Sequence, residues 1–442
     1  MRVYKGSAFS LLIAFSGASQ AVEQQPVISA PDSSCCFTSP FFSQSSMTLL
    51  FKNYWKYLKE ENANPKRVHN AWGQGVALDY QSGYLADIIG VDADYYGVAK
   101  LGASDYFNSR GVLYSHGAAN QKSSAHGYTK FGQRNIKLKL HPADATVNAR
   151  WGWQKIKKTG VITSSTRLSP TTYLGWTGAM QYNALTLRGA YVERSMARNS
   201  PDTMRFQTNA GNYINHIATG DVQWKNETLN ILYGYGESHQ YLRRQLVLAQ
   251  WTPSERLSFG SQIYRTHALD AYSSMPASKR DFDNNAWHVA ADATWKGERW
   301  SSKWGVAYTE ARKKDEVGFF PRHMSKQSFG NFISMAYAGD DYMRDGELVL
   351  SNLSDYALTP DLSVGLTGNI AQFSYRKNHV RTGEISAFTR WMPVRDLTLW
   401  AIAGPGWSYK AQGKTPVLHN GRYDRTHTLS SEIIVEYKFK IF

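Results

Sequence analysis

The chain has almost no cysteine and no long hydrophobic run. Its two cysteines, Cys35 and Cys36, are adjacent and too few for the disulfide framework of a small exported domain. We interpret them as incidental, with a strained vicinal disulfide as the alternative. Beyond residue 21 no stretch approaches the roughly 18 consecutive apolar residues of a transmembrane helix. These absences exclude a disulfide-stapled scaffold and a helical membrane protein.

Motifs of catalysis and metal binding are also missing. There is no Cys-x-x-Cys pair, no His-Glu-x-x-His helix and no glycine-rich phosphate loop. Ser115-His116 and Ser238-His239 are adjacent in sequence, but the members of a catalytic triad must converge in space. The isoelectric point is about 9.5, yet the basic residues are spread over the whole chain, which argues against nucleic-acid binding. We therefore expect no enzyme, no metal and no cofactor.

The first residues have the composition of an export signal. Arg2 and Lys5 precede a mostly apolar segment, and Ser19-Gln20-Ala21 fits the small-x-small cleavage pattern. We therefore expect a signal peptide at residues 1–21 and export from the cytoplasm.

What the chain does contain is alternation with a period of two. From Met47 onward, runs of about ten residues alternate apolar and polar side chains, as where Ile136, Leu138 and Leu140 are separated by Lys137 and Lys139. The mean hydropathy of −0.46 is compatible with this pattern, because lipid-facing and interior residues cancel in any average. Aromatic residues make up 14% of the chain, which suits the girdles of a membrane barrel.

The links between these runs alternate in length. Tight links rich in Gly, Pro, Asn and Asp fall at residues 81–83, 141–144, 182–184, 225–227, 252–255, 296–298, 359–361 and 393–396. Between them lie mostly longer polar segments, such as 103–126, 155–175, 195–212, 267–285, 311–343 and 411–424. Short periplasmic turns that alternate with long extracellular loops are typical of bacterial outer-membrane barrels.

The number of strands follows from the rhythm of the turns. Nineteen alternating runs are present, but a bacterial barrel needs an even number, and the run Phe329 to Ala338 would put two strands between consecutive tight turns. Assigning that run to a long loop leaves 18. We therefore predict an all-β fold with one transmembrane antiparallel barrel of about 18 strands over residues 47–442. A partly disordered periplasmic lead-in is expected over 22–46.

The last strand carries a second indication. Tyr437, Phe439 and Ile441 share one parity, and Phe442 ends the chain on the other. An amphipathic last strand with a terminal Phe resembles the signal read by the barrel assembly machinery, which is therefore an expected partner.

Five segments in the same order resemble the OprD family of substrate-specific porins, which includes chitoporin-like members. They are FFSQSSMTLLFKNYW at 41–55, WGQGVALDYQSGY at 72–84, SSTRLSP at 164–170, Ile263 to Thr266, and Ala286-Trp287. The resemblance implies an 18-stranded barrel with long loops folded inward to narrow the channel. It also implies, for several members, a ladder of basic side chains that guides carboxylate-bearing nutrients.

Parity selects the candidate pore-lining residues. If the apolar side chains of a strand face lipid, the side chains between them face the lumen. A lipid-facing Arg or Lys at mid-depth destabilises a barrel by ~2–4 kcal/mol, so charged residues are expected on the lumen side. Arg167 ranks first because it lies in SSTRLSP, which matches the family's constriction-loop motif. The other candidates are Lys155, Arg150, Lys137, Lys139, Arg188, Lys303, Arg390, Asp79 and Asp292. The alternative is that these residues solvate a wide barrel and pair with one another.

The expected function is passive, selective diffusion of small polar nutrients, anionic or carboxylate-bearing, across the outer membrane of a Gram-negative bacterium. A chitooligosaccharide-type sugar porin and a closed-lumen surface receptor or adhesin are the alternatives. Outer-membrane lipids, lipopolysaccharide and small polar solutes are the expected partners. A homo-oligomer is also compatible with the sequence, because the apolar face of a barrel meets lipid or another copy equally well.

Overall fold

The computed structural model describes residues 39–60, 67–105, 111–117, 121–332 and 342–408, five residues between 416 and 423, and residues 426–442. The signal peptide, most of the lead-in, Cys35 and Cys36 lie outside these residues, so the predictions about them stay predictions. Within the described part of the chain, no helix has the length and apolar character needed to cross a bilayer.

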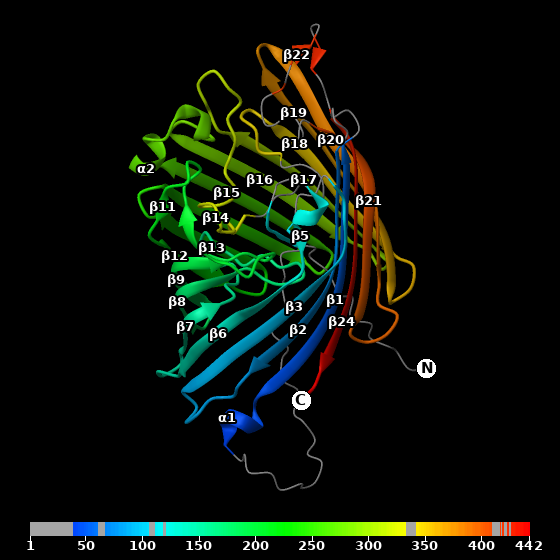
Figure 1. Ribbon diagram of the computed structural model, residues 1–442. Helices are drawn as coiled ribbons and strands as arrows, with labels where there is room; N and C mark the ends of the chain where they lie inside the picture. The colour runs from blue at the N-terminus through cyan, green and yellow to red at the C-terminus, as the bar shows by residue number, and fades with distance from the viewer. Residues whose placement is uncertain are drawn as a thin grey trace.

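Eighteen antiparallel strands form a closed barrel, which confirms the predicted fold and strand number (Figure 1). They are β1 (Ser46–Glu60), β2 (Arg67–Gln81), β3 (Ile89–Ala103), β6 (Tyr128–Leu140), β7 (Thr146–Gln154), β8 (Thr172–Tyr182), β9 (Leu185–Met196), β12 (Ile217–Lys225), β13 (Leu229–Ser238), β14 (Leu242–Ser254), β15 (Leu257–Ala268), β16 (Asn285–Lys296), β17 (Trp300–Glu310), β18 (Leu348–Ala357), β19 (Leu362–Tyr375), β20 (Asn378–Trp391), β21 (Leu397–Ser408) and β24 (Thr426–Lys440). Closure comes from β24, which pairs with β1 from Thr48↔Lys440 to Glu60↔Thr428.

Short elements occupy the connections. The short strands are β4 (Tyr114–Ser115), β5 (Ala125–His126), β10 (Thr203–Gln207), β11 (Tyr213–Ile214), β22 (Leu418–His419) and β23 (Arg422–Tyr423). The helical turns are α1 (Pro40–Ser43), η1 (Lys122–Ser124), α2 (Asp270–Ser273) and η2 (Ala277–Lys279). Except for α1, which lies before β1, all of them belong to the long connections at the end of the barrel opposite the tight turns.

The tight turns lie at the same end as the C-terminus and α1 (Figure 1). The Met47 N–H donates to the Phe442 carbonyl at 3.1 Å, which brings the start of β1 beside the chain end. Asn183 and Asp396 adopt positive φ in two of the predicted turns, a conformation that their short polar side chains tolerate. At the opposite end two connections are also short, at residues 239–241 and 376–377.

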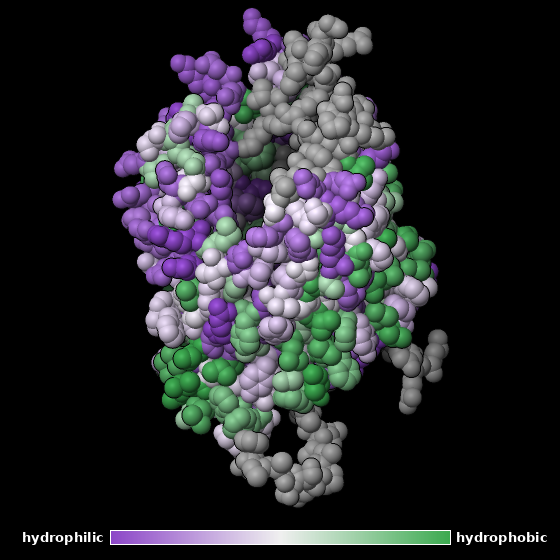
Figure 2. All heavy atoms as spheres, viewed as in Figure 1, coloured by the Kyte–Doolittle hydropathy of each residue, from purple (hydrophilic) through white to green (hydrophobic). Residues whose placement is uncertain are grey.

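The outer wall is apolar where the barrel meets lipid. Ile136, Leu138 and Leu140 are exposed, whereas Lys137 between them is buried, as the alternation predicts. On the visible face, hydrophobic residues gather over the lower part of the barrel and hydrophilic residues over the upper part, where the surface is hollowed (Figure 2). Exposed Trp251 and Trp304 lie near the tight turns, as in a periplasmic aromatic girdle.

Two apolar cores fill part of the interior and hold loops inside the barrel. In the larger core, Ile156, Val161 and Ile162 from residues 155–171 pack with Phe320 and Met324 from residues 311–347 and with the wall from β8 to β16. In the smaller core, Val112 and Leu113 pack with Leu168 against β1–β3, β20, β21 and β24. We call residues 155–171 the constriction loop and the described residues 311–332 and 342–347 the long loop. Both pack inside the barrel.

Candidate functional site: the inner wall and the constriction

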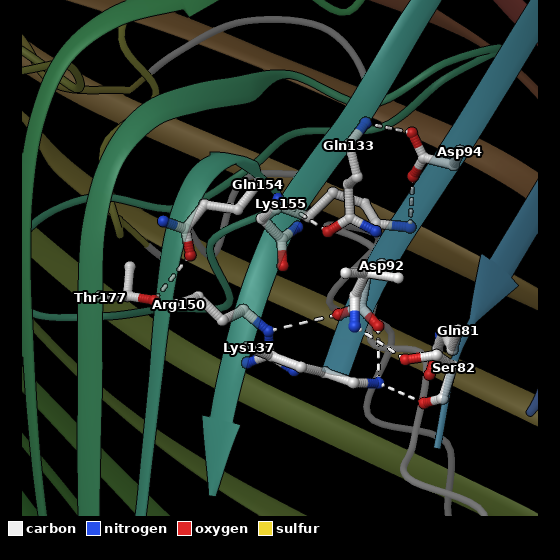
Figure 3. A network of polar contacts seen from close by, with 12 residues as sticks. Gln81, Ser82, Asp92, Asp94, Gln133, Lys137, Arg150, Gln154, Lys155 and Thr177 are labelled. Carbon is white, nitrogen blue, oxygen red and sulfur yellow. Dashed lines mark hydrogen bonds and ion pairs between the residues drawn. The ribbon is translucent and has the colours of Figure 1, made fainter. Parts of the chain in front are cut away.

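A network of alternating charges lines the wall of β2, β3, β6 and β7 (Figure 3). Asp92 accepts from Lys137 Nζ at 2.7 Å and lies 3.4 Å from Arg150 Nε. The Lys137 ammonium also donates to the Ser82 carbonyl at 2.8 Å, and its side chain is only 7% exposed. Arg150 keeps 43% of its side chain exposed. Of these two predicted pore-lining cations, Arg150 is therefore the more exposed.

Lys155 joins this wall to the constriction loop. Its ammonium lies 2.7 Å from Asp79 and 3.0 Å from the fully buried Asp94, and its side chain is 29% exposed. The Lys155 N–H donates to the side-chain carbonyl of Gln133 at 3.0 Å. Asp94 also accepts from the Tyr96 hydroxyl at 2.9 Å. These contacts fix the point at which the loop leaves β7.

The remaining predicted wall residues are mostly paired as well. Arg188 Nε donates to Asp221 at 2.8 Å, and Lys303 Nζ lies 3.2 Å from Asp292. Asp221 in turn accepts from the Gly160 N–H at 2.6 Å, which attaches the constriction loop to β12. On the wall, these side chains thus have the geometry of the alternative in which charged residues of the lumen pair with one another.

Lys139 and Arg390 are placed differently from the paired residues. The Lys139 ammonium lies 5.6 Å from the centre of the Tyr84 ring, near the tight-turn end of the barrel. Arg390 donates to the Met392 sulfur at 3.2 Å, also at that end, and is half-buried. These contacts, with Tyr84 and Met392, involve none of the residues labelled in Figure 3.

The constriction loop and the long loop are hydrogen-bonded to one another. The Thr163 N–H donates to the Phe329 carbonyl at 2.9 Å, and the Asn331 N–H donates to the Val161 carbonyl at 2.8 Å. The Tyr173 hydroxyl bridges the two loops, because it donates to Thr163 and accepts from the Phe329 N–H. Phe329 to Phe332 therefore belong to the loop assembly and not to a barrel strand, and the rest of the predicted loop run, 333–338, lies outside the described residues.

Three arginines from three loops gather where these segments meet. Arg198, between β9 and β10, donates to Ser165 of the constriction loop and lies 4.9 Å above the Phe329 ring. Burial lowers the pKa of Arg198 to about 9, and the neighbouring guanidinium groups of Arg167 and Arg322 act in the same direction. Within the described part of the chain, no carboxylate lies within ion-pair distance of Arg198. Arg167 itself lies 5.5 Å over the Tyr54 ring on β1.

Arg244 on β14 attaches the long loop to the barrel wall. It is fully buried and donates to the Arg322 carbonyl at 2.9 Å, to the Pro321 carbonyl and to the Thr266 hydroxyl. The Phe320 ring lies 4.9 Å from its guanidinium carbon. The alternation of side chains did not identify Arg244 as an interior residue. Leu242 and Leu246 lie on the same face of the strand, and an apolar face is expected to meet lipid, whereas this one packs against the loops inside the barrel. Arg198 was missed because it lies outside any alternating run.

Glycines on β2 make room for the tip of the constriction loop. A Cβ at Gly73 would lie 2.7 Å from Leu168 Cδ1 and 3.1 Å from Leu113 Cδ2. Gly73→Val should therefore displace Leu168, at a cost of about 1–3 kcal/mol for overpacking, and move the neighbouring Arg167. We expect an altered single-channel conductance in planar bilayers.

Gly97→Val on β3 is the matched control. A Cβ at Gly97 meets no atom within 4 Å, so this variant should conduct like the wild type. Equal conductance changes in the two variants would show that the contact with Leu168 does not set the width of the channel.

Comparisons with known proteins agree with this architecture. Residues 39–341 match the model of the outer membrane porin, OprD family. Acinetobacter baumannii OccAB1 is similar in structure with a TM-score of 0.74, at 14% identity over 92% of this chain and 99% of that one. Pseudomonas aeruginosa OpdK, solved with vanillate, gives a TM-score of 0.70 at 13% identity over 90% of this chain and all of that one.

A curated relative matches over a shorter segment. The membrane-associated protein UidC of Escherichia coli K12 is 32% identical over 97 residues, which are 20% of this chain and 23% of UidC. The family match, by contrast, covers well over half of the chain and includes both the constriction loop and most of the long loop. The chain belongs to the OprD family of outer membrane porins, and its barrel sits in the bacterial outer membrane.

Proposed function

We propose that this porin passes small carboxylate-bearing nutrients and that the selective element is the arginine cluster Arg167, Arg198 and Arg322. The observation that carries the proposal is geometric: Arg198 donates to Ser165, two residues from Arg167, and lies over the Phe329 ring of the long loop, so arginines from three loops lie near one another. Fixed cationic side chains in a narrow passage favour anions and raise their local concentration.

The charge balance of the wall supports a role for the loops. On this wall the cations Lys137, Arg150 and Lys155 are paired with the anions Asp79, Asp92 and Asp94, three charges of each sign. A matched set of charges gives little net field along the channel. We therefore propose that the arginine cluster contributes the bias toward anions, with the exposed part of Arg150 as a second contact for the solute.

One structural neighbour supports a carboxylate solute. OpdK was solved with vanillate, an aromatic carboxylate, and shares the fold of this chain. The identity is only 13%, so the likeness supports the class of solute that we propose, not the particular molecule.

The sugar-porin alternative calls for aromatic faces open to the lumen, on which sugar rings stack. Tyr54 and Tyr128 on the inner wall are at most 7% exposed, because residues of the constriction loop cover them: Arg167 lies over the Tyr54 ring, and the Tyr128 hydroxyl is hydrogen-bonded to Ser169. We therefore rank that alternative second. The receptor alternative differs in a simpler way, since a closed lumen passes no ions.

We also propose that the barrel assembly machinery reads β24. Tyr437 and Phe439 on this strand and Ile441 just beyond its end have 40–49% exposure, as an amphipathic signal strand requires. Truncation of Phe442 should lower the amount of folded barrel recovered from outer membranes. Unchanged recovery would contradict this part of the proposal.

Planar bilayers test the proposed selectivity. The reconstituted barrel should give stepwise conductance, and its reversal potential under a KCl gradient should have the sign of an anion-preferring channel. A cation-preferring reversal potential would refute the carboxylate proposal, and the absence of any conductance would refute the pore itself. Current block by chitooligosaccharides but not by carboxylates would favour the sugar-porin alternative.

A further inference from the structure

A basic hollow lies on the outer wall of the barrel at its extracellular end. It is lined by Arg243 and Gln245 of β14 and by Arg265 and His267 of β15, with a volume of about 220 Å³. These side chains point away from the lumen, because Arg244 between them is buried against the long loop. The hollow is therefore separate from the channel.

The strand register places the hollow directly above the lipid-facing surface. Val247 and Ile263 are paired across the strands and exposed, as the apolar face of a barrel requires. Two residues further toward the loops, or about 7 Å along the strand, Gln245 pairs with Arg265. The next outward pair is Arg243 with His267.

An aromatic side chain beside the hollow indicates the edge of the membrane. The exposed Trp287 of β16 is paired with Arg265, and aromatic girdles flank the apolar band of such barrels. The hollow therefore lies at the level of the outer girdle, next to the lipid headgroups.

Neighbouring groups orient the cations of the hollow without neutralising all of them. Arg265 donates from Nε and Nη2 to the side-chain oxygen Oδ1 of Asn285 at 3.3 and 3.2 Å, and its guanidinium carbon lies 5.3 Å from the centre of the Trp287 ring. His267 lies 3.1 Å from the same Asn285 oxygen. In the described structure Arg265 has no carboxylate partner, whereas Arg243 is paired with Glu237 at 3.0 Å.

We propose that this hollow binds a phosphate of lipopolysaccharide, with the acyl chains of the same lipid A lying along Val247, Ile263 and Trp287. Arginine suits this partner because its planar guanidinium donates two parallel hydrogen bonds to a phosphate. The arrangement of cations above a continuous apolar surface complements a phosphorylated headgroup above its acyl chains. The proposal does not depend on which solute the channel passes.

Binding to the full-length barrel in detergent tests the proposal by native mass spectrometry. Diphosphoryl lipid A should bind more tightly than phosphatidylglycerol and than inorganic phosphate. In Arg243→Gln/Arg265→Gln the affinity for lipid A should fall about tenfold, as expected for the loss of charge-assisted contacts. The charge-keeping Arg243→Lys/Arg265→Lys should retain most of it.

Arg381→Gln is the matched control. Arg381 also lies on the outer face near the extracellular end, where it donates to Gln372 across the strand pair at 3.1 Å, but it does not line this hollow. This variant should bind lipid A like the wild type. Unchanged single-channel conductance in every variant shows that the barrel is intact. Wild-type affinity in Arg243→Gln/Arg265→Gln, or equal affinity for lipid A and phosphatidylglycerol, would overturn the proposal.

Discussion

Arg167→Ala/Arg198→Ala should remove most of the anion preference of the channel. Each guanidinium interacts with an anion that passes within a few ångströms, and two such charges in a partly hydrated constriction contribute about 1–2 kcal/mol. The ratio of anion to cation permeability should therefore fall roughly tenfold. Reversal potentials of single channels under a KCl gradient measure this ratio directly.

Arg312→Ala controls for the loss of positive charge alone. Its side chain is 83% exposed beside Glu310 in the long loop, outside the arginine cluster. The permeability ratio of this variant should stay at the wild-type value. If Arg167→Ala/Arg198→Ala kept the wild-type ratio, the selectivity would have to reside elsewhere in the channel.

Arg244→Met should release the long loop from the barrel wall. The substitution keeps an unbranched apolar side chain but removes hydrogen bonds to two loop carbonyls and to Thr266. Losing charged hydrogen bonds of this kind costs about 2–4 kcal/mol, or roughly a 30- to 1,000-fold rise in the equilibrium for local opening. Hydrogen exchange at the Phe320 and Asn331 amides, which are bonded in the docked loop, should accelerate accordingly.

The channel current provides a second measurement on the same variant. An undocked long loop should make the current noisier and raise its mean, because the loop no longer fills the lumen beside the constriction loop. Arg381→Met removes an outward-facing arginine of β20, a strand distant from β14, and should change neither exchange nor current. Slow exchange at Phe320 in Arg244→Met would contradict the role of Arg244 as an anchor.

The barrel was predictable because its determinants are local in sequence. Alternation such as Ile136, Lys137 and Leu138 fixes which face of a strand meets lipid, and short turns such as that at Asn183 fix where strands end. Each strand carries this information without reference to the rest of the chain. The tight turns on either side of the run Phe329 to Ala338 were likewise recognisable from local sequence. Leaving this run out of the count therefore gave the correct number of strands.

The interior was less predictable because its contacts connect distant parts of the chain. Lys137 has the parity of a lumen residue, but its ion pair with Asp92, 45 residues away, depends on the register between β3 and β6. Arg244 is a charged residue on an otherwise apolar face of β14. Its position is explained only by the long loop, which packs on that face. The arginine cluster likewise depends on three loops whose paths no periodicity describes.

Solute flux into proteoliposomes is the most direct test of the proposed function. A small carboxylate and an uncharged sugar of the same size should be compared at equal concentration in vesicles that hold the purified barrel. The arginine cluster predicts faster uptake of the carboxylate, and this difference should disappear in Arg167→Ala/Arg198→Ala. Equal uptake of the two solutes by the wild-type barrel, or faster uptake of the sugar, would contradict a constriction selective for carboxylates.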